Sequence, residues 1–545
     1  MSNIPAQFKP PVGKDEFITG ITDKPEDRVE VGILFVGAGP ASLAGAIRLA
    51  QLLSAEPGVM EKLGEIPIAI IEKGKYPGAH LLSGAVVNPI SFRRLFPDTK
   101  DSDFPFFGPV DGEAVYFLTR EMALRLPTPP TMHNKGNFVA SISKIGQWLG
   151  ERAEEAGVMI LNEMSGMKLL VDNGVVRGVR TDDKGLDKDS KPLGNFQPGS
   201  DIVARVTVLG EGTTGHLSMA LIDHFNLGRA NPQVYALGVK EIWEVPNPLD
   251  SVIHTMGWPL RASRKYSEFG GSFIYPMGLY RVSIGMVVGL DYADAFLSVH
   301  DLLQELKTHP LVMNILDGGR RADNGWGAKT IPEGGFYAIP DRLNVPGALM
   351  IGDCAGFVNV PALKGIHYAM MSGILAAETI FTALKSNVEP SDPKALAGYD
   401  EAIKKSIIWK DLYKVRNMRQ AFQYGFMPGF VLAGLMTITN GLLPGGRFSS
   451  HRDSEMALFI GDKHSYPKPD NEYIFDKLTS VYSSGNRTRD NQPDHIHILK
   501  DVPETIGEAW INMCPAQVYE WHEENGHKVI RTDPSNCVQC GAITS

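Results

Sequence analysis

The sequence predicts an α/β protein, α+β overall, with a Rossmann-like domain, a β-sheet domain interleaved with it, and a small cysteine-bearing C-terminal module. Three observations predict this organisation. Short apolar strands alternate with helical patterns early in the chain, strand-like segments follow in its middle, and three of the four cysteines lie in the last segment. With 545 residues and 43% hydrophobic content, the chain is also long enough to form several lobes.

The alternation starts with predicted strands at 31–36 and 68–71 and predicted helices at 41–53 and 145–156. This order favours a sheet with crossover helices. The polar run 182–201 predicts an exposed loop or a β-excursion.

The middle of the chain is rich in strand patterns, as at 272–275 and 280–288, which predicts a second domain built on a sheet. We predict the following boundaries: 28–240 for the first part of the Rossmann-like domain, 241–340 for the sheet domain, 341–420 for the second part of the Rossmann-like domain, 421–447 for an apolar segment, and 501–545 for the cysteine module.

Charge and cysteine usage exclude several classes of protein. The chain has 53 basic and 62 acidic residues, a net charge of -9, and no Lys/Arg run that would form a nucleic-acid-binding stripe. The clustering of Cys514, Cys537 and Cys540, with Cys354 alone, favours a metal site in a reducing compartment over disulfides. Residues 1–17 lack the basic-then-apolar layout of a secretory signal, so a cytoplasmic location is expected.

A glycine-rich loop follows the first predicted strand. Its residues are Gly37-Ala38-Gly39-Pro40-Ala41-Ser42, and they open an Ala-rich helix. In a dinucleotide fingerprint, Gly37 permits the tight turn, and Gly39 lets the backbone approach a pyrophosphate that the helix start attracts. Ser42 takes the third glycine position and is small enough for close helix packing. The loop predicts a dinucleotide site, with an ordinary strand-to-helix turn as the alternative.

A carboxylate ends the second predicted strand. Glu72 follows residues 68–71 and is placed to accept hydrogen bonds from ribose hydroxyls. Its spacing from Gly37 is longer than usual, which we attribute to an insertion at 54–67. Glu72 therefore supports the dinucleotide hypothesis.

A second acidic strand end occurs late in the chain. The apolar strand 349–351 runs into Gly352-Asp353, and a long helix is predicted from about Ala362. An acidic side chain here can bind the ribityl hydroxyls of a flavin, while the helix start faces the pyrimidine end of the ring. The alternative is that Asp353 caps a turn. Together with the first loop, this segment predicts FAD.

No second strand-linked glycine fingerprint is evident in the sequence. The loop 210–215 follows a predicted strand, and we interpret it as another loop against the same flavin. A dedicated NAD(P)H site is therefore not indicated. Electrons are expected from a protein partner or from a substrate bound at the flavin.

Several segments together resemble the electron transfer flavoprotein–ubiquinone oxidoreductase family, in its bacterial type, and they occur in the family's order from about residue 30 to 540. They are GAGPAS at 37–42, Glu72-Lys73-Gly74, GAHLLSGA at 78–85, Gly270-Gly271-Ser272-Phe273, Glu333-Gly334-Gly335-Phe336, and GDCAGFVNVPALKGIHYAMMSG from Gly352.

The resemblance implies FAD, a [4Fe–4S] cluster and a quinone site, in a protein that oxidises reduced electron transfer flavoprotein at a membrane surface. By position, Gly270 and Gly271 resemble the backbone that meets the quinone headgroup, with a bulge or tight turn beside Phe269 as the alternative. The residues assigned to the flavin are Gly37, Gly39, Ala41, Ser42, Glu72, Lys73, Ser83, Gly84, Gly352, Asp353 and Gly365.

Two other functions are compatible with the flavin loops. One is a flavin-dependent isoprenoid reductase or aromatic hydroxylase, which needs no cysteine module. The other is a docking subunit of a larger electron-transfer complex. The quinone is either ubiquinone or menaquinone, and no nucleic acid partner is expected.

The apolar segment predicts peripheral membrane association. No charged residue occurs between Arg419 and Arg447. The run 425–443 approaches the roughly 20 residues that span a bilayer, but a Pro-Gly pair near its start and an Asn-Gly pair near its end interrupt it. A continuous helix is therefore expected only at about 430–439. At about 1.5 Å per residue, it is too short for a hydrocarbon core of roughly 30 Å.

Such a helix should dip into one leaflet, at the cytoplasmic face of the inner membrane, and give the quinone a route to the flavin. A buried core helix is the alternative. The basic residues expected at anionic headgroups are Lys414, Arg416, Arg419, Arg447 and Arg452.

The cysteine module departs from the family pattern. The family has one Cys followed by Pro and then a Cys-x-x-Cys-x-x-Cys run. This chain has Cys514-Pro515 and Cys537-Val538-Gln539-Cys540, but Ile543 stands at the fourth ligand position. We expect a [4Fe–4S] or three-iron cluster on three thiolates, with His522, His527, Asp533 or water at the open iron. An empty or zinc-filled site is the alternative.

Overall fold

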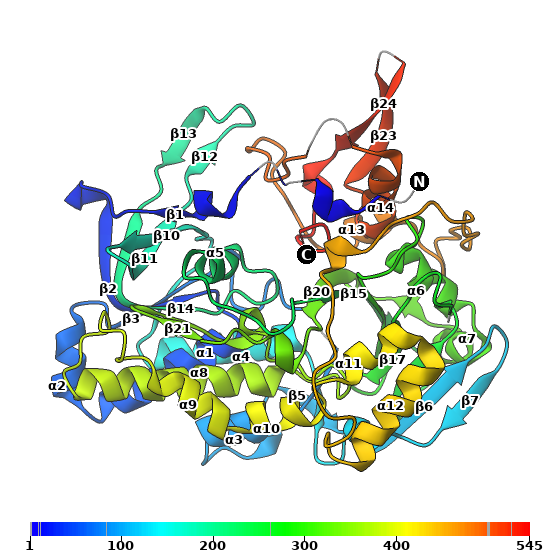
Figure 1. The fold of residues 1–545 in the computed structure, drawn as a ribbon, viewed down its shortest axis with the longest axis horizontal. Helices are drawn as coiled ribbons and strands as arrows, with labels where there is room; N and C mark the ends of the chain where they lie inside the picture. Colours follow the sequence, from blue (N-terminus) through cyan, green and yellow to red (C-terminus); the bar gives the residue numbers. More distant parts are fainter. Residues whose placement is uncertain are drawn as a thin grey trace.

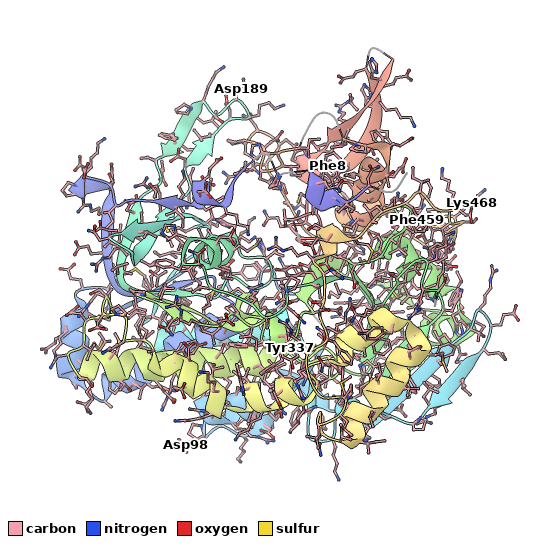
Figure 2. The ribbon with its side chains drawn as sticks, viewed as in Figure 1. Phe8, Asp98, Asp189, Tyr337, Phe459 and Lys468 are labelled. Atoms are coloured by element: carbon pink, nitrogen blue, oxygen red, sulfur yellow. The ribbon has the colours of Figure 1, made fainter. Side chains whose placement is uncertain are left out.

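The computed structural model describes residues 3–8, 10, 12–82, 84–261, 263–498, 502–524 and 526–544. Figure 1 shows two large lobes, each with a sheet and covering helices, and the C-terminal module above one of them. The N-terminal segment lies against the segment after α12, because the Asn3 and Leu458 backbones are hydrogen-bonded. Figure 2 shows Phe8 and Phe459 on this same upper side of the molecule.

The first lobe is built on a nine-stranded sheet. Its parallel centre has the spatial order β22, β14, β2, β3. Along the chain, β2 (Arg28–Val36), β3 (Ile68–Ile71) and β14 (Asp201–Leu209) come first, and β22 (Ala348–Met350) comes much later. Two stretches of chain thus form one sheet, as predicted. The other strands are β1 (Ile18–Thr19), β9 (Met159–Leu161), β10 (Gly166–Asp172), β11 (Val175–Thr181) and β21 (Asn344–Val345).

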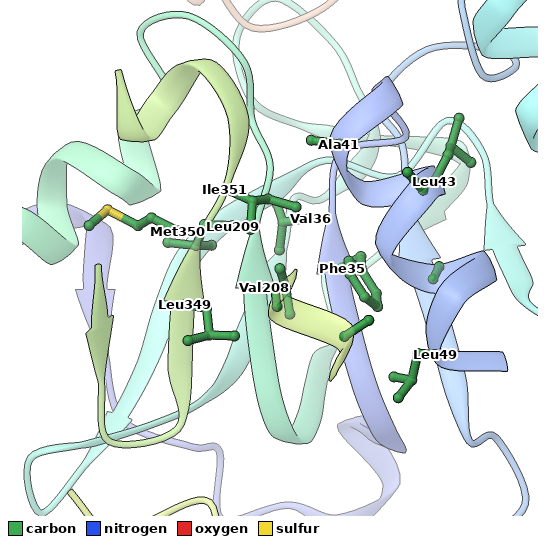
Figure 3. Packing of buried hydrophobic residues seen from close by; sticks show 14 of the residues in the cluster. Phe35, Val36, Ala41, Leu43, Leu49, Val208, Leu209, Leu349, Met350 and Ile351 are labelled. Atoms are coloured by element: carbon green, nitrogen blue, oxygen red, sulfur yellow. The ribbon is translucent and has the colours of Figure 1, made fainter. Parts of the chain in front are cut away.

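Helices α1 (Pro40–Ser54) and α8 (Ile366–Lys385) pack together against this sheet. A Cβ atom on Gly45 would lie 2.9 Å from the Gly373 carbonyl oxygen, and one on Gly373 would lie 2.0 Å from that of Ala41. Only glycines allow this close approach. Figure 3 shows the core of this lobe, where Phe35, Val208 and Leu349 lie on neighbouring strands and Phe35 lies beside α1, the helix that carries Leu43 and Leu49.

The remaining elements of this lobe lie at its margins. They are α2 (Pro57–Met60), α3 (Ile90–Leu95), α4 (Ile142–Glu155), α5 (His216–His224), α9 (Gly398–Lys405), α10 (Ile407–Lys414), and a three-stranded sheet of β4 (Ala85–Val87), β5 (Phe106–Pro109) and β8 (Phe138–Ala140). The polar run is a two-stranded ribbon, β12 (Lys184–Leu186) with β13 (Pro192–Gln197), which confirms a β-excursion.

The second lobe contains an eight-stranded sheet in the order β19-β15-β18-β17-β16-β6-β7, with β20 on β15. Helix α6 packs on β15 and β18 and buries the core of this lobe. The elements are β6 (Gly112–Leu118), β7 (Ala123–Leu126), β15 (Tyr235–Glu244), β16 (Ser251–Gly257), β17 (Gly270–Pro276), β18 (Arg281–Gly289), β19 (Arg320–Arg321), β20 (Gly327–Pro332), α6 (Val299–Lys307) and α7 (Pro310–Leu316).

The C-terminal module packs on the core of the second lobe. Ala516, Val518 and Tyr519 are buried in the same apolar cluster as Trp243 and Trp326 of the second lobe. The hairpin at its tip projects away from both sheets (Figure 1). The module consists of α13 (Lys477–Tyr482), α14 (Glu504–Met513), β23 (Tyr519–Glu524) and β24 (His527–Thr532).

Two helix boundaries differ from the prediction. The apolar helix α12 (Phe426–Ile438) starts before Pro428 instead of after it. Proline is compatible with the first helical turn, whose N–H groups have no partner within the helix. Helix α8 starts at Ile366, four residues later than predicted, because Asn359 and Lys364 pair through both backbone groups and hold a turn there.

A buried ion pair in the second lobe gives a stability prediction. The Lys307 ammonium lies 2.8 Å from Glu241, and both side chains are fully buried. Burial opposes ionisation, but Lys307 and Arg321 together hold the pKa of Glu241 at about 2. Lys307→Met should lower the free energy of unfolding by about 3 kcal/mol, because a buried carboxylate loses its main partner.

Urea unfolding of the purified variant measures this loss. Lys385→Met is the matched control, because its ion pair with Glu56 is exposed and should contribute less than about 1 kcal/mol. Equal losses in the two variants would contradict the prediction.

Candidate functional site

A continuous cavity of about 4580 Å³ lies between the two lobes and the C-terminal module. The glycine loop before α1, the Gly352-Asp353 segment, the Gly270-Gly271 pair, α12 and the three clustered cysteines all contribute to its lining. The structure thus brings the predicted quinone and metal residues and, apart from the buried Ser42, the described flavin residues to one cavity. Ser83 lies outside the described residues.

The glycine loop is shaped to hold an anion. Gly37 has φ +90°, and a Cβ atom on it would lie 2.9 Å from the Gly210 carbonyl oxygen. A Cβ atom on Gly39 would meet only the Gly210 carbonyl oxygen, at 4.0 Å, and Gly39 lines the cavity. Ser42 is fully buried, and its hydroxyl has no hydrogen-bond partner among the described residues. This cradle at a helix start fits a pyrophosphate.

Glu72 joins the two flavin loops of the first lobe. One carboxylate oxygen accepts the Ala38 N–H at 2.8 Å and the other accepts the Gly74 N–H at 2.7 Å. Each oxygen keeps a second lone pair that can accept a hydroxyl. Glu211, which the sequence did not single out, instead holds the start of α5, where it accepts the Ser218 N–H at 2.6 Å.

Asp353 lines the cavity where the late strand ends. Burial raises the pKa of its carboxyl to about 6, and Lys329 opposes that rise. The preceding Gly352 has φ +66° and donates its N–H to Ser372 at 2.9 Å. The Asp353 carboxyl therefore lies on a fixed turn at the cavity wall, where it can form hydrogen bonds with a bound group. These residues fit the ribityl end of a flavin.

Asp353 gives a prediction for the flavin-free protein. A pKa near 6 in the folded state exceeds the unfolded value near 4, so its contribution is fully present below about pH 4 and is lost as the pH rises through 6. From pH 4 to 8 the wild type should lose about 2 kcal/mol relative to Asp353→Asn. Urea unfolding at several pH values measures this difference, and parallel profiles would contradict it.

Gly270 and Gly271 are the first residues of β17 and pair regularly with β18. They form neither a bulge nor a tight turn. A Cβ atom on Gly270 would lie 2.1 Å from the Val287 carbonyl oxygen, and one on Gly271 would lie 2.4 Å from that of Thr255. Strand packing alone therefore requires glycine at both positions. Their contact with a quinone headgroup stays a prediction.

The three clustered cysteines lie near one another and none is in a disulfide. Burial raises the pKa of the Cys540 thiol to about 12, and the charges of Cys514 and Cys537 add to that rise. Within the described ranges no three His, Cys, Asp or Glu side chains are arranged around a single metal ion. A cluster differs from such a site, because each thiolate binds a separate iron.

The fourth ligand position faces apolar side chains. Ile543 packs against the core of the second lobe together with Cys537 and Cys540. His522 and His527 are exposed on the projecting hairpin, and neither they nor Asp533 lines the cavity with the cysteines. The donor set fits a cluster held by three thiolates, with no protein ligand from these three residues.

Two lysines hold the cysteine turn, Lys73 from the loop after β3 and Lys329 from β20 of the second lobe. The Lys73 ammonium donates to the Gln539 side-chain oxygen at 2.7 Å, and that of Lys329 donates to the Gln539 carbonyl at 3.0 Å. Thr330 donates both its N–H and its hydroxyl to the Cys540 carbonyl, each at 2.9 Å. No local pattern points to Lys329, because its partners are distant along the chain.

Helix α12 presents an apolar surface to solvent. Only Gly429 and Met436 are buried along it, which excludes the buried core helix. Its exposed side chains include Met427, Phe430, Val431, Leu435 and Ile438. In the described part of the chain, no helix is both long and apolar enough to cross a membrane.

Two of the basic residues assigned to lipid headgroups are buried instead. Arg416 is 6% and Arg419 7% exposed. The Arg419 guanidinium lies 2.9 Å from Glu333 and 2.7 Å from Asp291, and it stacks over the Phe269 ring. Charge neutralisation within the protein keeps it inside, so these two predictions were wrong.

Comparison with known proteins identifies the family. Residues 235–331 match the family model for the ubiquinone-binding part of ETF-QO, and residues 471–544 match the 4Fe-4S model of electron transfer flavoprotein-ubiquinone oxidoreductase. A mitochondrial electron transfer flavoprotein-ubiquinone oxidoreductase of Dictyostelium discoideum is 40% identical over 95% of this chain and 87% of its own. The chain belongs to the electron transfer flavoprotein–ubiquinone oxidoreductase family. The corresponding proteins of Homo sapiens and Pseudomonas aeruginosa are 37% and 36% identical to this chain. Each alignment covers 94% of this chain, together with 85% of the human protein and 94% of the Pseudomonas aeruginosa protein.

Solved structures share the fold alone. A geranylgeranyl bacteriochlorophyll reductase-like protein of Thermoplasma acidophilum aligns with a TM-score of 0.54 and 16% identity over 76% of this chain and 98% of its own. The flavin-dependent brominase Bmp2 aligns with a TM-score of 0.52 and 15% identity over 76% and 94%.

Membership of the electron transfer flavoprotein–ubiquinone oxidoreductase family confirms the predicted fold class, family and cofactor set of FAD, iron–sulfur cluster and quinone. The assignment of individual residues to those groups stays a prediction, as do the domain boundaries.

Proposed function

We propose that this protein accepts electrons from reduced electron transfer flavoprotein and passes them to ubiquinone. The observation that carries the proposal is the cavity, which joins the glycine cradle, the cysteines and the Gly270-Gly271 strand without a wall between them. Family membership supports the same donor and acceptor.

Different residues of the chain hold the FAD, the iron–sulfur cluster and the quinone. The glycine loop, Glu72 and Asp353 hold FAD, and Cys514, Cys537 and Cys540 hold the iron–sulfur cluster. When bound, these groups store and relay single electrons between a one-electron donor and a two-electron acceptor. Lys73 and Lys329 hold the cysteine turn at the edge of the cavity, where its thiolates would bind the cluster. Gly271 and its neighbours shape the quinone pocket.

The quinone enters the cavity from a lipid surface, along the side chains of α12 that line the cavity. Phe426, Phe430 and Ile438 belong both to this helix and to the lining of the cavity. We place the protein at the cytoplasmic face of the inner membrane, bound to one leaflet. Two of the relatives named above, those of Dictyostelium discoideum and Homo sapiens, are named mitochondrial.

Anaerobic mixing of the purified protein with reduced electron transfer flavoprotein and a short-chain ubiquinone tests the proposal. The flavin spectrum should bleach with the donor and recover with the quinone, and iron analysis should give at least three irons per flavin. Fast bleaching by NADPH would instead favour an isoprenoid reductase or hydroxylase. Purification as a stable multi-subunit complex, with little activity of the chain alone, would favour a docking subunit.

A further inference from the structure

A buried histidine–tyrosine pair lies on the sheet face that lines the cavity. His254 Nε2 and Tyr275 Oη are 2.8 Å apart, and each residue is 5% exposed. Side chains alternate along β17, so Tyr275 shares its face with Phe273 and Gly271. The Phe273 and Tyr275 rings indeed lie 4.7 Å apart. The pair therefore shares its sheet face with Gly271 and lines the same cavity as both predicted quinone glycines.

Glu113 connects this face to solvent. Strand β6 runs beside β16, with Glu113 opposite Val252 and Val115 opposite His254, so Glu113 and His254 lie on one face. One Glu113 oxygen is 2.5 Å from His133 Nδ1, and the other accepts the Asn134 N–H at 2.8 Å. The His133 side chain is 55% exposed. Protons from water can therefore reach Glu113.

Lys364 lines the same cavity as His254 and Tyr275. It belongs to the loop before α8, is 8% exposed, and donates to the Ala362 carbonyl at 3.2 Å. Burial lowers the pKa of Lys364 to about 8, and Glu113 opposes that shift. Burial and the Lys364 charge lower the pKa values of His254 and His367 to about 3. Both imidazoles are neutral at pH 7, so each can accept a proton at one nitrogen and donate from the other.

We propose that Glu113, Lys364, His254 and Tyr275 form a proton path from solvent to the quinone in the cavity. The path rests on the quinone reduction proposed above. Reduction of one quinone to quinol adds two electrons to the ring and one proton to each carbonyl oxygen. The electrons come from the reduced flavoprotein donor. The protons come from water through Glu113 and Lys364, and Tyr275 regains from His254 each proton that it gives up.

Tyr275→Phe tests the inner end of the path, because it removes the hydroxyl and keeps the ring. In stopped-flow measurements on prereduced holoprotein, oxidation by ubiquinone-1 should slow by about 100-fold, with an increased solvent deuterium isotope effect. Uptake of the first electron from reduced electron transfer flavoprotein should be unchanged. Calorimetry should give the wild-type affinity of the oxidised protein for the quinone.

Glu113→Gln tests the outer end and should slow the same step, while the conservative Glu113→Asp should retain most of the rate. Tyr292→Phe is the matched control, because Tyr292 is a buried tyrosine of the same lobe that does not line the cavity. Wild-type quinone rates and isotope effects in both Tyr275→Phe and Glu113→Gln would overturn the path. So would equal slowing of the donor and quinone steps. A wild-type protein that ubiquinone-1 fails to oxidise refutes the proposed function itself, and the path with it.

Discussion

Replacing Gly39 with glutamate yields protein without bound flavin. The position has room for a Cβ atom within the protein, since the nearest atom is 4.0 Å away, so the fold tolerates the change. The added carboxylate instead occupies the cradle and repels the pyrophosphate. Absorbance of the purified variant should show less than about one-tenth of the wild-type flavin content, a loss that accords with full removal of the helix-start anion site.

The control for this variant is Gly58→Glu. Gly58 lies in α2 and has no atom within 4 Å of an added Cβ, but it is not part of the cavity lining. It should keep its full flavin content. A Gly39→Glu protein with an unchanged flavin spectrum would show that the loop does not hold the cofactor.

Glutamate at Met427, Val431 and Leu435 should release the protein from membranes. These three positions are four residues apart and share one exposed face of α12, and none of them lines the cavity. Burying these side chains in a leaflet stabilises the membrane-bound state by roughly 1.5–3 kcal/mol per side chain. Three glutamates remove this stabilisation, because their charged carboxylates favour water over the leaflet. Vesicle affinity should fall by more than about 100-fold, while the flavin content stays unchanged.

Flotation with phosphatidylethanolamine–phosphatidylglycerol vesicles measures the release. Leu193→Glu and Tyr482→Glu are controls, because both side chains are exposed on elements far from α12 in the chain. They should float like the wild type. If the triple variant also floats with the vesicles, α12 is not the membrane contact. If it loses its flavin, α12 instead supports the folded core.

The parts of the fold that could be predicted are those with local causes. The apolar runs 31–36 and 68–71 became strands because they are buried on both faces of a parallel sheet. The start of α12 could not be placed, because proline is equally compatible with a first helical turn and with the residue before one.

Long-range partners account for the rest. Arg419 resembles a headgroup ligand in sequence, yet Glu333 and Asp291 bury it, and they lie 86 and 128 residues away. Lys329 is an unremarkable strand residue until the fold brings it to Gln539. The glycine loop and the cysteines were recognised because their chemistry restricts which residues can occupy them.

The hydrogen bonds from Lys73 and Lys329 to Gln539 bear on the order in which the protein folds and takes up its cluster. These contacts join residues 466 and 210 positions apart in the chain. We therefore expect the turn between Cys537 and Cys540 to reach its final form only after both lobes have folded and met. Cluster insertion would then be a late step. We expect a variant that folds incorrectly in either lobe to show first a lowered iron content.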